Sequence, residues 1–158
     1  MATYEVHSIG TIKNNGEEVY LQVDPNYIPA LKALDGFSHI QVVWWFSDFV
    51  DKESRAVLTT PQPYKKAPKE MGIFATRSPI RPNPIALTTA QVLHFDYEAG
   101  IIELAYIDAN DNTPVLDIKP YTPSLDRVEY PDVPNWCSNW PKSLEESGDF
   151  PWETVFNF

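Results

Sequence analysis

Several features that would point to a secreted, membrane or disulfide-stabilised protein are missing from this sequence. It contains one cysteine, Cys137, so no disulfide can form within the chain. No apolar run approaches the roughly 18 residues of a transmembrane helix. The first ten residues, MATYEVHSIG, lack the basic and apolar regions of a secretory signal. We therefore expect a soluble cytoplasmic protein without membrane attachment.

The sequence also lacks the common signatures of metal and nucleotide chemistry. Its three histidines, His7, His39 and His94, form no metal-ligand spacing, and no CxxC occurs, so we expect no metal. GxSxG and P-loop motifs are absent, and Cys137 has no basic neighbour to activate it, so we interpret it as a packing residue. Without GxGxxG or βαβ alternation, a doubly wound sheet is excluded.

Basic residues are scarce and unevenly placed. The chain has 12 Lys and Arg against 22 Asp and Glu, which gives a net charge of −10. Five of the 12 fall within residues 65–81, namely Lys65, Lys66, Lys69, Arg77 and Arg81. This distribution suits local binding of an anionic ligand and disfavours non-specific binding of polyanions.

Hydrophobic residues make up 43% of the chain, enough for a packed core in one domain. Short β-branched and aromatic segments, separated by turn signals such as Asn14-Asn15-Gly16 and Glu98-Ala99-Gly100, predict a mainly β fold, an antiparallel barrel or sandwich of about seven strands. The expected strands are Tyr4–Ile12, Val19–Val23, His39–Phe46, Gly72–Ala75, Ile85–Phe95, Ile101–Tyr106 and Pro114–Ile118. Short helices are expected at Tyr27–Leu34 and Ser54–Leu58.

Two segments carry more apolar surface than a small β domain needs. His39–Phe46 is apolar at successive positions, which predicts a strand buried on both faces or lying between the core and a partner chain. Residues 131–158 hold six large aromatics among polar residues: Trp136, Trp140, Phe150, Trp152, Phe156 and Phe158. We interpret residues 1–130 as one domain and 131–158 as an arm that packs on it or on a second subunit, with a short helix at Lys142–Ser147.

The segment Gly72–Leu87, GIFATRSPIRPNPIAL, is the strongest candidate for a binding loop. Three prolines fix φ and hold the residues before them extended, which excludes a helix. The loop therefore presents Arg77, Ser78, Arg81 and Asn83 on a preorganised path, so that less entropy is lost on binding. The alternative is a proline-rich connector with ordinary surface arginines.

A second candidate is Thr113–Tyr121, TPVLDIKPY, in which Asp117 and Lys119 share one face of a strand. They are either an ordinary exposed pair that contributes little to stability, or part of a polar pocket beside the arginine loop.

These segments together resemble the TsaA-like (TrmO) family of tRNA methyltransferases. The resemblance rests on Leu34–Ile40 (LDGFSHI), Gly72–Leu87 and Thr113–Pro123 (TPVLDIKPYTP), in this order along the chain. It implies a small antiparallel β-barrel that binds S-adenosylmethionine and works as a homodimer. The family reaction methylates the exocyclic nitrogen of threonylcarbamoyl-adenosine beside the tRNA anticodon.

The resemblance also implies roles for individual residues. Arg81 would contact the cofactor, and its pocket would be lined by Ser47, Asp48, Leu116, Asp117, Ile118 and Lys119. We expect the tRNA substrate to meet Arg77 and Asn83 from the loop, and its phosphates to meet Lys65, Lys66 and Lys69. Asp117 and Asp48 are the candidates for accepting a proton from the substrate nitrogen.

Two other functions remain open at this stage. One is a methyltransferase of the same fold that acts on a small molecule or another RNA, which the acidic charge favours. The other is a non-catalytic protein that binds S-adenosylmethionine.

Overall fold

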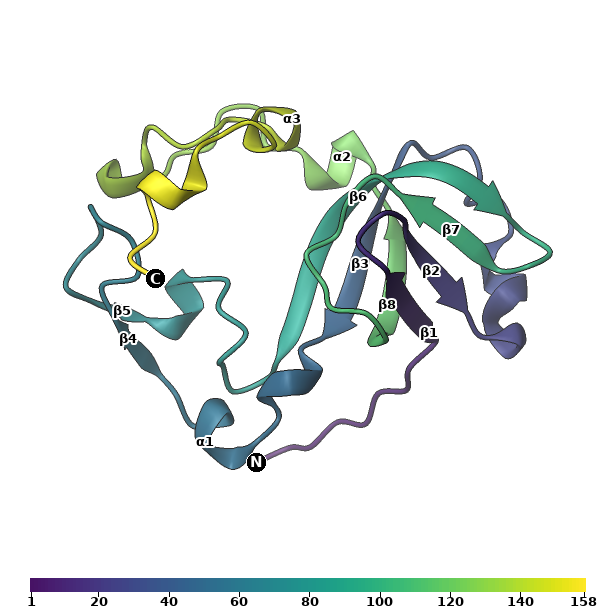
Figure 1. Cartoon of the computed structure of the whole chain (residues 1–158), viewed down its shortest axis with the longest axis horizontal. Helices are drawn as coiled ribbons and strands as arrows, with labels where there is room; N and C mark the ends of the chain where they lie inside the picture. The colour runs from purple at the N-terminus through teal and green to yellow at the C-terminus, as the bar shows by residue number, and fades with distance from the viewer.

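A computed structural model describes all 158 residues, and its largest part is a closed antiparallel barrel (Figure 1). The order of strands around the barrel is β1-β2-β7-β6-β3-β8. Their bounds are β1 Gly10–Asn14, β2 Val19–Val23, β3 His39–Trp45, β6 Ile85–Asp96, β7 Ile101–Leu104 and β8 Thr113–Pro120. This confirms the predicted mainly β, antiparallel barrel.

Both predicted hairpin turns are present. Gly16 and Gly100 adopt positive φ angles of 89° and 67°, which glycine tolerates without the clash of a Cβ atom. The Asn15 side chain accepts hydrogen bonds from the backbone N–H groups of Glu17 and Glu18 and so closes the first turn.

The barrel interior is filled by alternate residues of each strand. On β3, Ile40, Val42 and Trp44 are buried, whereas the residues between them are only half-buried. The expectation that this strand is buried on both faces is therefore wrong for the single chain, because strict alternation sends Val43 and Trp45 to the outer surface. The Trp44 indole N–H donates to Thr88 Oγ1 at 3.0 Å.

The predicted first strand is too long at its start. Strand β1 begins at Gly10, which pairs with both Val23 and Val115, whereas Tyr4 is fully exposed. Residues before Ile9 have no neighbouring strand that could satisfy their backbone groups, so β-branched and aromatic side chains alone do not make them a strand.

A separate extension leaves the barrel between β3 and β6. It contains η2 Ser47–Phe49, α1 Lys52–Arg55, and a two-stranded sheet of β4 Thr59–Pro61 and β5 Glu70–Gly72. The strand predicted at Gly72–Ala75 is wrong: β5 ends at Gly72 and a 3-10 turn, η3, covers Ile73–Ala75. The Thr76 backbone N–H and hydroxyl both donate to the Ile73 carbonyl and fix this turn. The barrel therefore has six strands where about seven were expected, because residues 72–75 do not join it.

The remaining short helices are η1 Pro25–Leu31, α2 Pro123–Asp126, η4 Asn135–Cys137, α3 Leu144–Ser147 and η5 Trp152–Thr154. No helix combines the length and the apolar character that crossing a membrane would require.

The C-terminal arm, residues 131–158, returns to the extension and lies across an opening from the barrel (Figure 1). Lys65 N–H donates to the Val155 carbonyl at 2.9 Å, and Asn157 N–H donates to the Pro63 carbonyl at 3.0 Å. Tyr64 forms an isolated β-bridge with Phe156. Within one chain the arm thus contacts the segment between β4 and β5; the domain boundary near residue 130 and packing on a second subunit stay predictions.

Gly10 is the position at which the barrel tolerates no side chain. A Cβ atom there would lie 2.4 Å from the Gln22 carbonyl oxygen and 2.9 Å from Val23 Cα, and both are backbone atoms that cannot rotate away. We expect Gly10→Ala to lower the free energy of unfolding by about 3 kcal/mol, measured by urea denaturation. Gly36→Ala is the matched control, because no atom lies within 4 Å of its Cβ, and it should cost less than about 0.5 kcal/mol. Equal midpoints for the two variants would contradict this packing.

Candidate functional site

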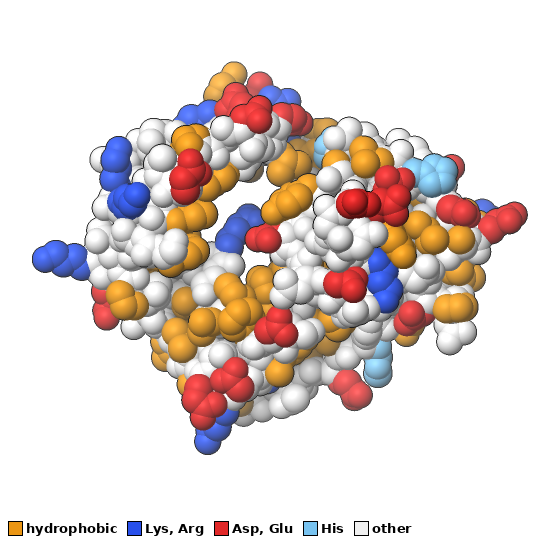
Figure 2. All heavy atoms as spheres, viewed as in Figure 1, with side chains coloured by type: hydrophobic (Ala, Val, Ile, Leu, Met, Phe, Trp, Pro, Cys, Tyr) orange, Lys and Arg blue, Asp and Glu red, His pale blue; other side chains and the backbone are white.

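A cavity of about 530 Å³, the main cavity, lies where the end of β3, the start of β6 and two loops meet. It opens toward the hollow between barrel and arm that Figure 2 shows on this side of the molecule. Its lining combines aromatic, cationic, acidic and amide side chains: Trp44, Trp45, Phe46, Ser47, Asp48, Phe49, Thr76, Arg77, Pro79, Arg81, Ile85, Ala86, Leu87, Thr88, Asp108, Ala109, Asn110 and Thr113.

Arg81 holds the proline-rich loop in shape as well as lining the cavity. Its Nη1 donates to the carbonyl oxygens of Thr76 at 3.2 Å and Ser78 at 3.1 Å. The guanidinium carbon lies 5.9 Å from the centre of the Phe74 ring, within the range of a cation–π contact. Both hydrogen bonds use Nη1, so Nε and Nη2 remain available as donors to a ligand.

Arg77 and Asn83 occupy different positions on this loop. Arg77 is exposed at the cavity and makes one long contact, 3.4 Å from Nη1 to the Leu87 carbonyl. Asn83 is also exposed but does not line the cavity, and its carbonyl accepts the Ile85 N–H at 2.7 Å. The loop therefore brings two guanidinium groups to the site, and the predicted role of the Asn83 amide stays a prediction.

An acidic and amide cluster lines the same cavity as the arginines. Asn110 Nδ2 donates to Asp48 Oδ2 at 2.9 Å, and Thr113 Oγ1 donates to the Asn110 carbonyl at 2.7 Å. These contacts join the end of β3 to the loop between β7 and β8. Asp48 Oδ1 makes no such bond and remains free as an acceptor.

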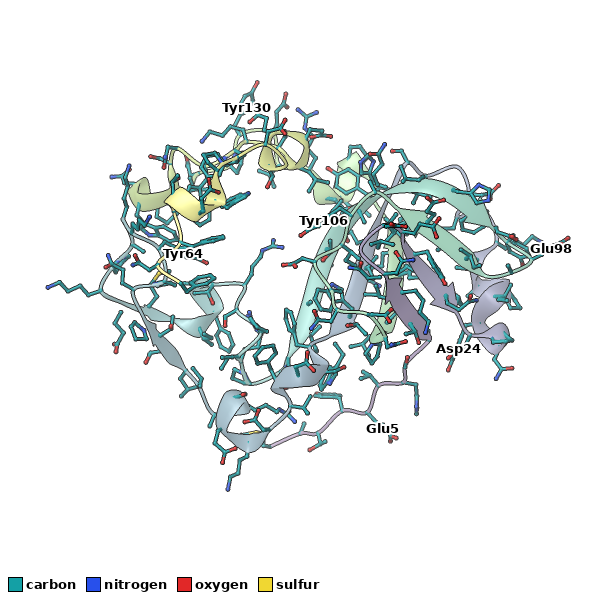
Figure 3. All side chains as sticks on the ribbon, in the orientation of Figure 1. Glu5, Asp24, Tyr64, Glu98, Tyr106 and Tyr130 are labelled. Atoms are coloured by element: carbon teal, nitrogen blue, oxygen red, sulfur yellow. The ribbon has the colours of Figure 1, made fainter.

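Sequence reasoning missed Asp108 and Asn110. In the sequence, the run Asn110-Asp111-Asn112 indicates only a turn, because Asn and Asp are common in every turn. Nearby Tyr106 is exposed and stands at the rim of the opening in Figure 3. Partial burial, followed by the negative charge of Asp108, raises the pKa of the Tyr106 phenol.

The β8 residues expected at the cofactor do not line this cavity. Ile118 packs against the barrel core, and Asp117 lies opposite Val43 on the outer surface. Asp117 Oδ2 instead pairs with Lys119 Nζ at 2.8 Å, and this hydrogen bond and charge raise the pKa of Lys119. The predicted roles of Leu116, Asp117, Ile118 and Lys119 thus receive no support from the cavity and stay predictions.

Lys65, Lys66 and Lys69 lie away from this cavity, between β4 and β5. All three are exposed, and Lys65 and Lys66 line a second cavity of about 180 Å³ against the C-terminal arm. No group of three or more His, Cys, Asp or Glu side chains is placed to hold a metal ion.

The main cavity has the chemistry to hold a ligand that is part flat ring and part charged chain. Trp45, Phe46 and Phe49 offer apolar surface to a ring, and the arginines can pair with a carboxylate in bidentate fashion. Asp48 and Asp108 can accept hydrogen bonds from hydroxyl or ammonium groups.

Comparison with known proteins identifies the family to which this chain belongs. Residues 10–127 match the family model of the tRNA-methyltransferase O N-terminal domain. The chain belongs to this family. The match contains all six barrel strands, the extension and every residue of the main cavity, and it ends before the aromatic arm.

Relatives of the TrmO family agree with this assignment. The chain is 36% identical over 112 residues to a probable S-adenosyl-L-methionine-binding protein of Archaeoglobus fulgidus, covering 71% of this chain and 28% of that protein. It is 36% identical over 118 residues to the tRNA (adenine(37)-N6)-methyltransferase of Escherichia coli, covering 72% and 48%. A crystal structure of TrmO superposes with a TM-score of 0.65 at 28% identity, covering 84% and 64%. The chain thus spans less than two thirds of each of these proteins.

The exposed ion pair between Asp117 and Lys119 on β8 can be tested for its contribution to stability. Asp117 and Lys119 retain 50% and 61% of their side-chain exposure, so water screens their attraction. We expect Asp117→Asn to leave the urea denaturation midpoint unchanged and to lower the pKa of Lys119, followed by NMR of the side-chain ammonium group. A lower midpoint would mean that this pair contributes to stability despite its exposure.

Proposed function

We propose that this chain is an S-adenosylmethionine-dependent methyltransferase that acts on the exocyclic nitrogen of threonylcarbamoyl-adenosine next to the tRNA anticodon. The observation that carries the proposal is the main cavity, which two arginines line together with a carboxylate and amide cluster within the family domain. The tRNA (adenine(37)-N6)-methyltransferase of Escherichia coli, a relative at 36% identity, supports methyl transfer to the N6 nitrogen of a tRNA adenine.

The residues of the cavity fit the cofactor. S-adenosylmethionine carries an adenine ring, a ribose, and a chain with one ammonium and one carboxylate group. Trp45, Phe46 and Phe49 would contact the adenine, Asp48 and Asn110 would bind hydroxyl or ammonium groups, and Arg81 would bind the carboxylate. When bound, the cofactor supplies a methyl group on a positively charged sulfur.

The protein's part in this reaction is mainly alignment. Transfer from a sulfonium releases a neutral thioether, so no residue has to protonate the leaving group. Holding acceptor and donor in line contributes up to roughly 7–11 kcal/mol to lowering a barrier. The hydrogen bonds from Arg81 to the Thr76 and Ser78 carbonyls keep the loop rigid for this purpose.

One proton has to leave the acceptor nitrogen, and Asp48 is the group we assign to receive it. Its Oδ2 is fixed by Asn110 at 2.9 Å, which leaves Oδ1 to face the cavity. Asp117, the other candidate, is engaged by Lys119 and does not line the cavity. Arg77, exposed at the same rim, would pair with the carboxylate of the threonylcarbamoyl group.

A second function is favoured by one specific observation. The Archaeoglobus fulgidus relative is described as a probable S-adenosyl-L-methionine-binding protein, without a reaction. A non-catalytic protein would use the same cavity and cofactor contacts but would show no turnover with tRNA.

We further propose that the chain works in the cytoplasm as a homodimer. An apolar band crosses the outer surface of β3 and β6, where Val43 pairs with Leu87 and Trp45 pairs with Ile85. Ile85 and Leu87 remain 42% and 49% exposed, which is unusual for neighbouring large aliphatic residues. Because the same residues line the main cavity, a second subunit on this band would help to close it.

Calorimetric titration with S-adenosylmethionine tests the cofactor assignment. We expect Arg81→Lys to weaken binding by at least about tenfold, because lysine keeps the charge but loses the planar fork that pairs with a carboxylate. Asp117→Asn is the control and should bind as the wild type does, since it lies outside the cavity. The reverse result, loss with Asp117→Asn alone, would move the cofactor to β8.

A methyl-transfer assay with tRNA that carries or lacks threonylcarbamoyl-adenosine tests the reaction. We expect turnover only with the modified tRNA, and a fall in kcat of about a hundredfold or more for Asp48→Asn at saturating cofactor. Cofactor binding without methylation of any tRNA would instead identify a non-catalytic binding protein.

A further inference from the structure

The C-terminal arm forms a connected chain of aromatic rings with Tyr64 of the extension. Tyr64 stacks on Trp136 with ring centres 5.4 Å apart and 12° between the planes, and meets the edge of Trp140 at 5.1 Å. From there the contacts run through Trp152 to Phe156 and Phe158. The family match ends at residue 127, so these arm residues lie outside the matched domain.

This aromatic cluster encloses the second cavity together with two lysines. The cavity, of about 180 Å³, is lined by Tyr64, Lys65, Lys66, Trp136, Asn139, Trp140, Thr154 and Val155. The three aromatic residues are half-buried, so their rings are partly accessible, whereas the lysines and Asn139 are exposed. The second cavity therefore has aromatic rings on its wall and lysine ammonium groups at its opening.

The lysines at this cavity have no acidic partner. The ion pair in the structure is Lys119–Asp117, far along the chain on β8. Lys65 Nζ reaches only the Glu153 backbone carbonyl at 3.4 Å, and Lys66 and Lys69 donate no side-chain hydrogen bond. In a chain with a net charge of −10, three neighbouring unpaired lysines are a local exception that favours an anion.

Rings and cations in this arrangement match the two parts of a nucleotide. Single-stranded nucleic acids bind where bases stack on aromatic side chains and phosphates meet Lys or Arg. Tyr64, Trp136 and Trp140 are half-buried aromatic residues on the wall of this cavity, and the ring faces that do not pack on one another are the surface for a base. Asn139 adds an amide that can hydrogen-bond to a base edge.

The charge of Arg77 acts on residues of both cavities. Arg77 lines the main cavity, and its positive charge partly offsets the rise in the pKa of Tyr64 that burial causes. In Figure 3, Tyr64 and Tyr106 stand on opposite sides of the central opening, and the residues that follow Tyr106, namely Asp108, Ala109 and Asn110, line the main cavity. One strand of RNA that crosses the opening would therefore reach both sites.

We propose that the cavity between Tyr64, Trp136, Trp140 and the lysines Lys65 and Lys66 is a second RNA subsite, which holds an unpaired nucleotide flanking the methylated one. The base stacks on the aromatic wall, and the lysines bind its phosphates. This proposal rests on the proposed function in that it takes tRNA as the substrate. In this proposal the arm binds the anticodon loop outside the methyl-transfer site.

The test measures RNA binding without cofactor, by fluorescence anisotropy of a fluorescein-labelled anticodon stem-loop at several salt concentrations. We expect the double variant Lys65→Ala, Lys66→Ala to bind at least about tenfold more weakly. Loss of two phosphate contacts should also reduce the slope of log K against log[salt] by about 1.4. The matched control is Lys32→Ala, Lys52→Ala, which removes two exposed lysines, one directly after η1 and one on α1, and should leave affinity and slope unchanged.

A second measurement does not depend on a variant that folds. The same stem-loop with 4-thiouridine at its unpaired positions is irradiated with the wild-type protein, and the crosslinked peptides are mapped by mass spectrometry. We expect crosslinks to Tyr64, Trp136 or Trp140. Because neither assay needs methyl transfer, a chain that proved to have no methyltransferase activity could still pass or fail them.

Three results would overturn the proposal. The first is equal RNA affinity for the wild type and the Lys65, Lys66 variant; the second is equal loss with the Lys32, Lys52 control. The third is unchanged RNA affinity together with a change in sedimentation coefficient, which would make the cavity an interface between two copies of the chain.

Discussion

The pairing of β3 with both β6 and β8 is the constraint on which the main site depends. This strand closes the barrel, and its register sends Trp44 inward while Val43 and Trp45 face outward. A shift by one residue would exchange these two sets and expose Ile40 and Val42. The partly buried hydrogen bond from Trp44 to Thr88 links β3 to β6 in this register. Because β3 ends at Trp45, Phe46 and Asp48 are delivered to the cavity at the barrel's edge.

From this edge the chain forms the extension before it returns as β6. The arginine loop lies between the extension and β6, so the segment that leaves the barrel after β3 supplies Ser47 and Asp48 at its start and Arg77 and Arg81 near its end to the main cavity. Arg81 both stabilises the arginine loop and lines the cavity. Its guanidinium satisfies two loop carbonyls through one nitrogen and keeps its other donors for a ligand, which a lysine, with its single ammonium group, would do less well.

The C-terminal arm stabilises the extension through its own contacts. Backbone hydrogen bonds from Lys65 and Asn157, together with the rings around Tyr64, hold the extension from its far side. Without the arm, the two short strands β4 and β5 would form an isolated hairpin, which is only marginally stable in water. The aromatic residues thus explain how a small extension away from the barrel core remains ordered, and they also provide the surface that we assign to RNA.

The sequence by itself determined the antiparallel β class, the two hairpin turns and the non-helical path of the proline-rich loop. These follow from local rules: alternation along a strand, positive φ at Gly16 and Gly100, and the fixed φ of proline. Local preference alone was misleading at Tyr4 and at Ile73, where suitable side chains lack a partner strand.

Only the tertiary structure decided which distant residues share the main cavity. Asp48 and Asn110 are 62 positions apart in the chain, and nothing local to either predicts their hydrogen bond. The structure likewise placed Lys65 beside Trp140 and kept Asp117 out of the cavity. The physical reason is that periodicity and turn preference act over a few residues, whereas barrel closure and the return of the arm set contacts across the whole chain.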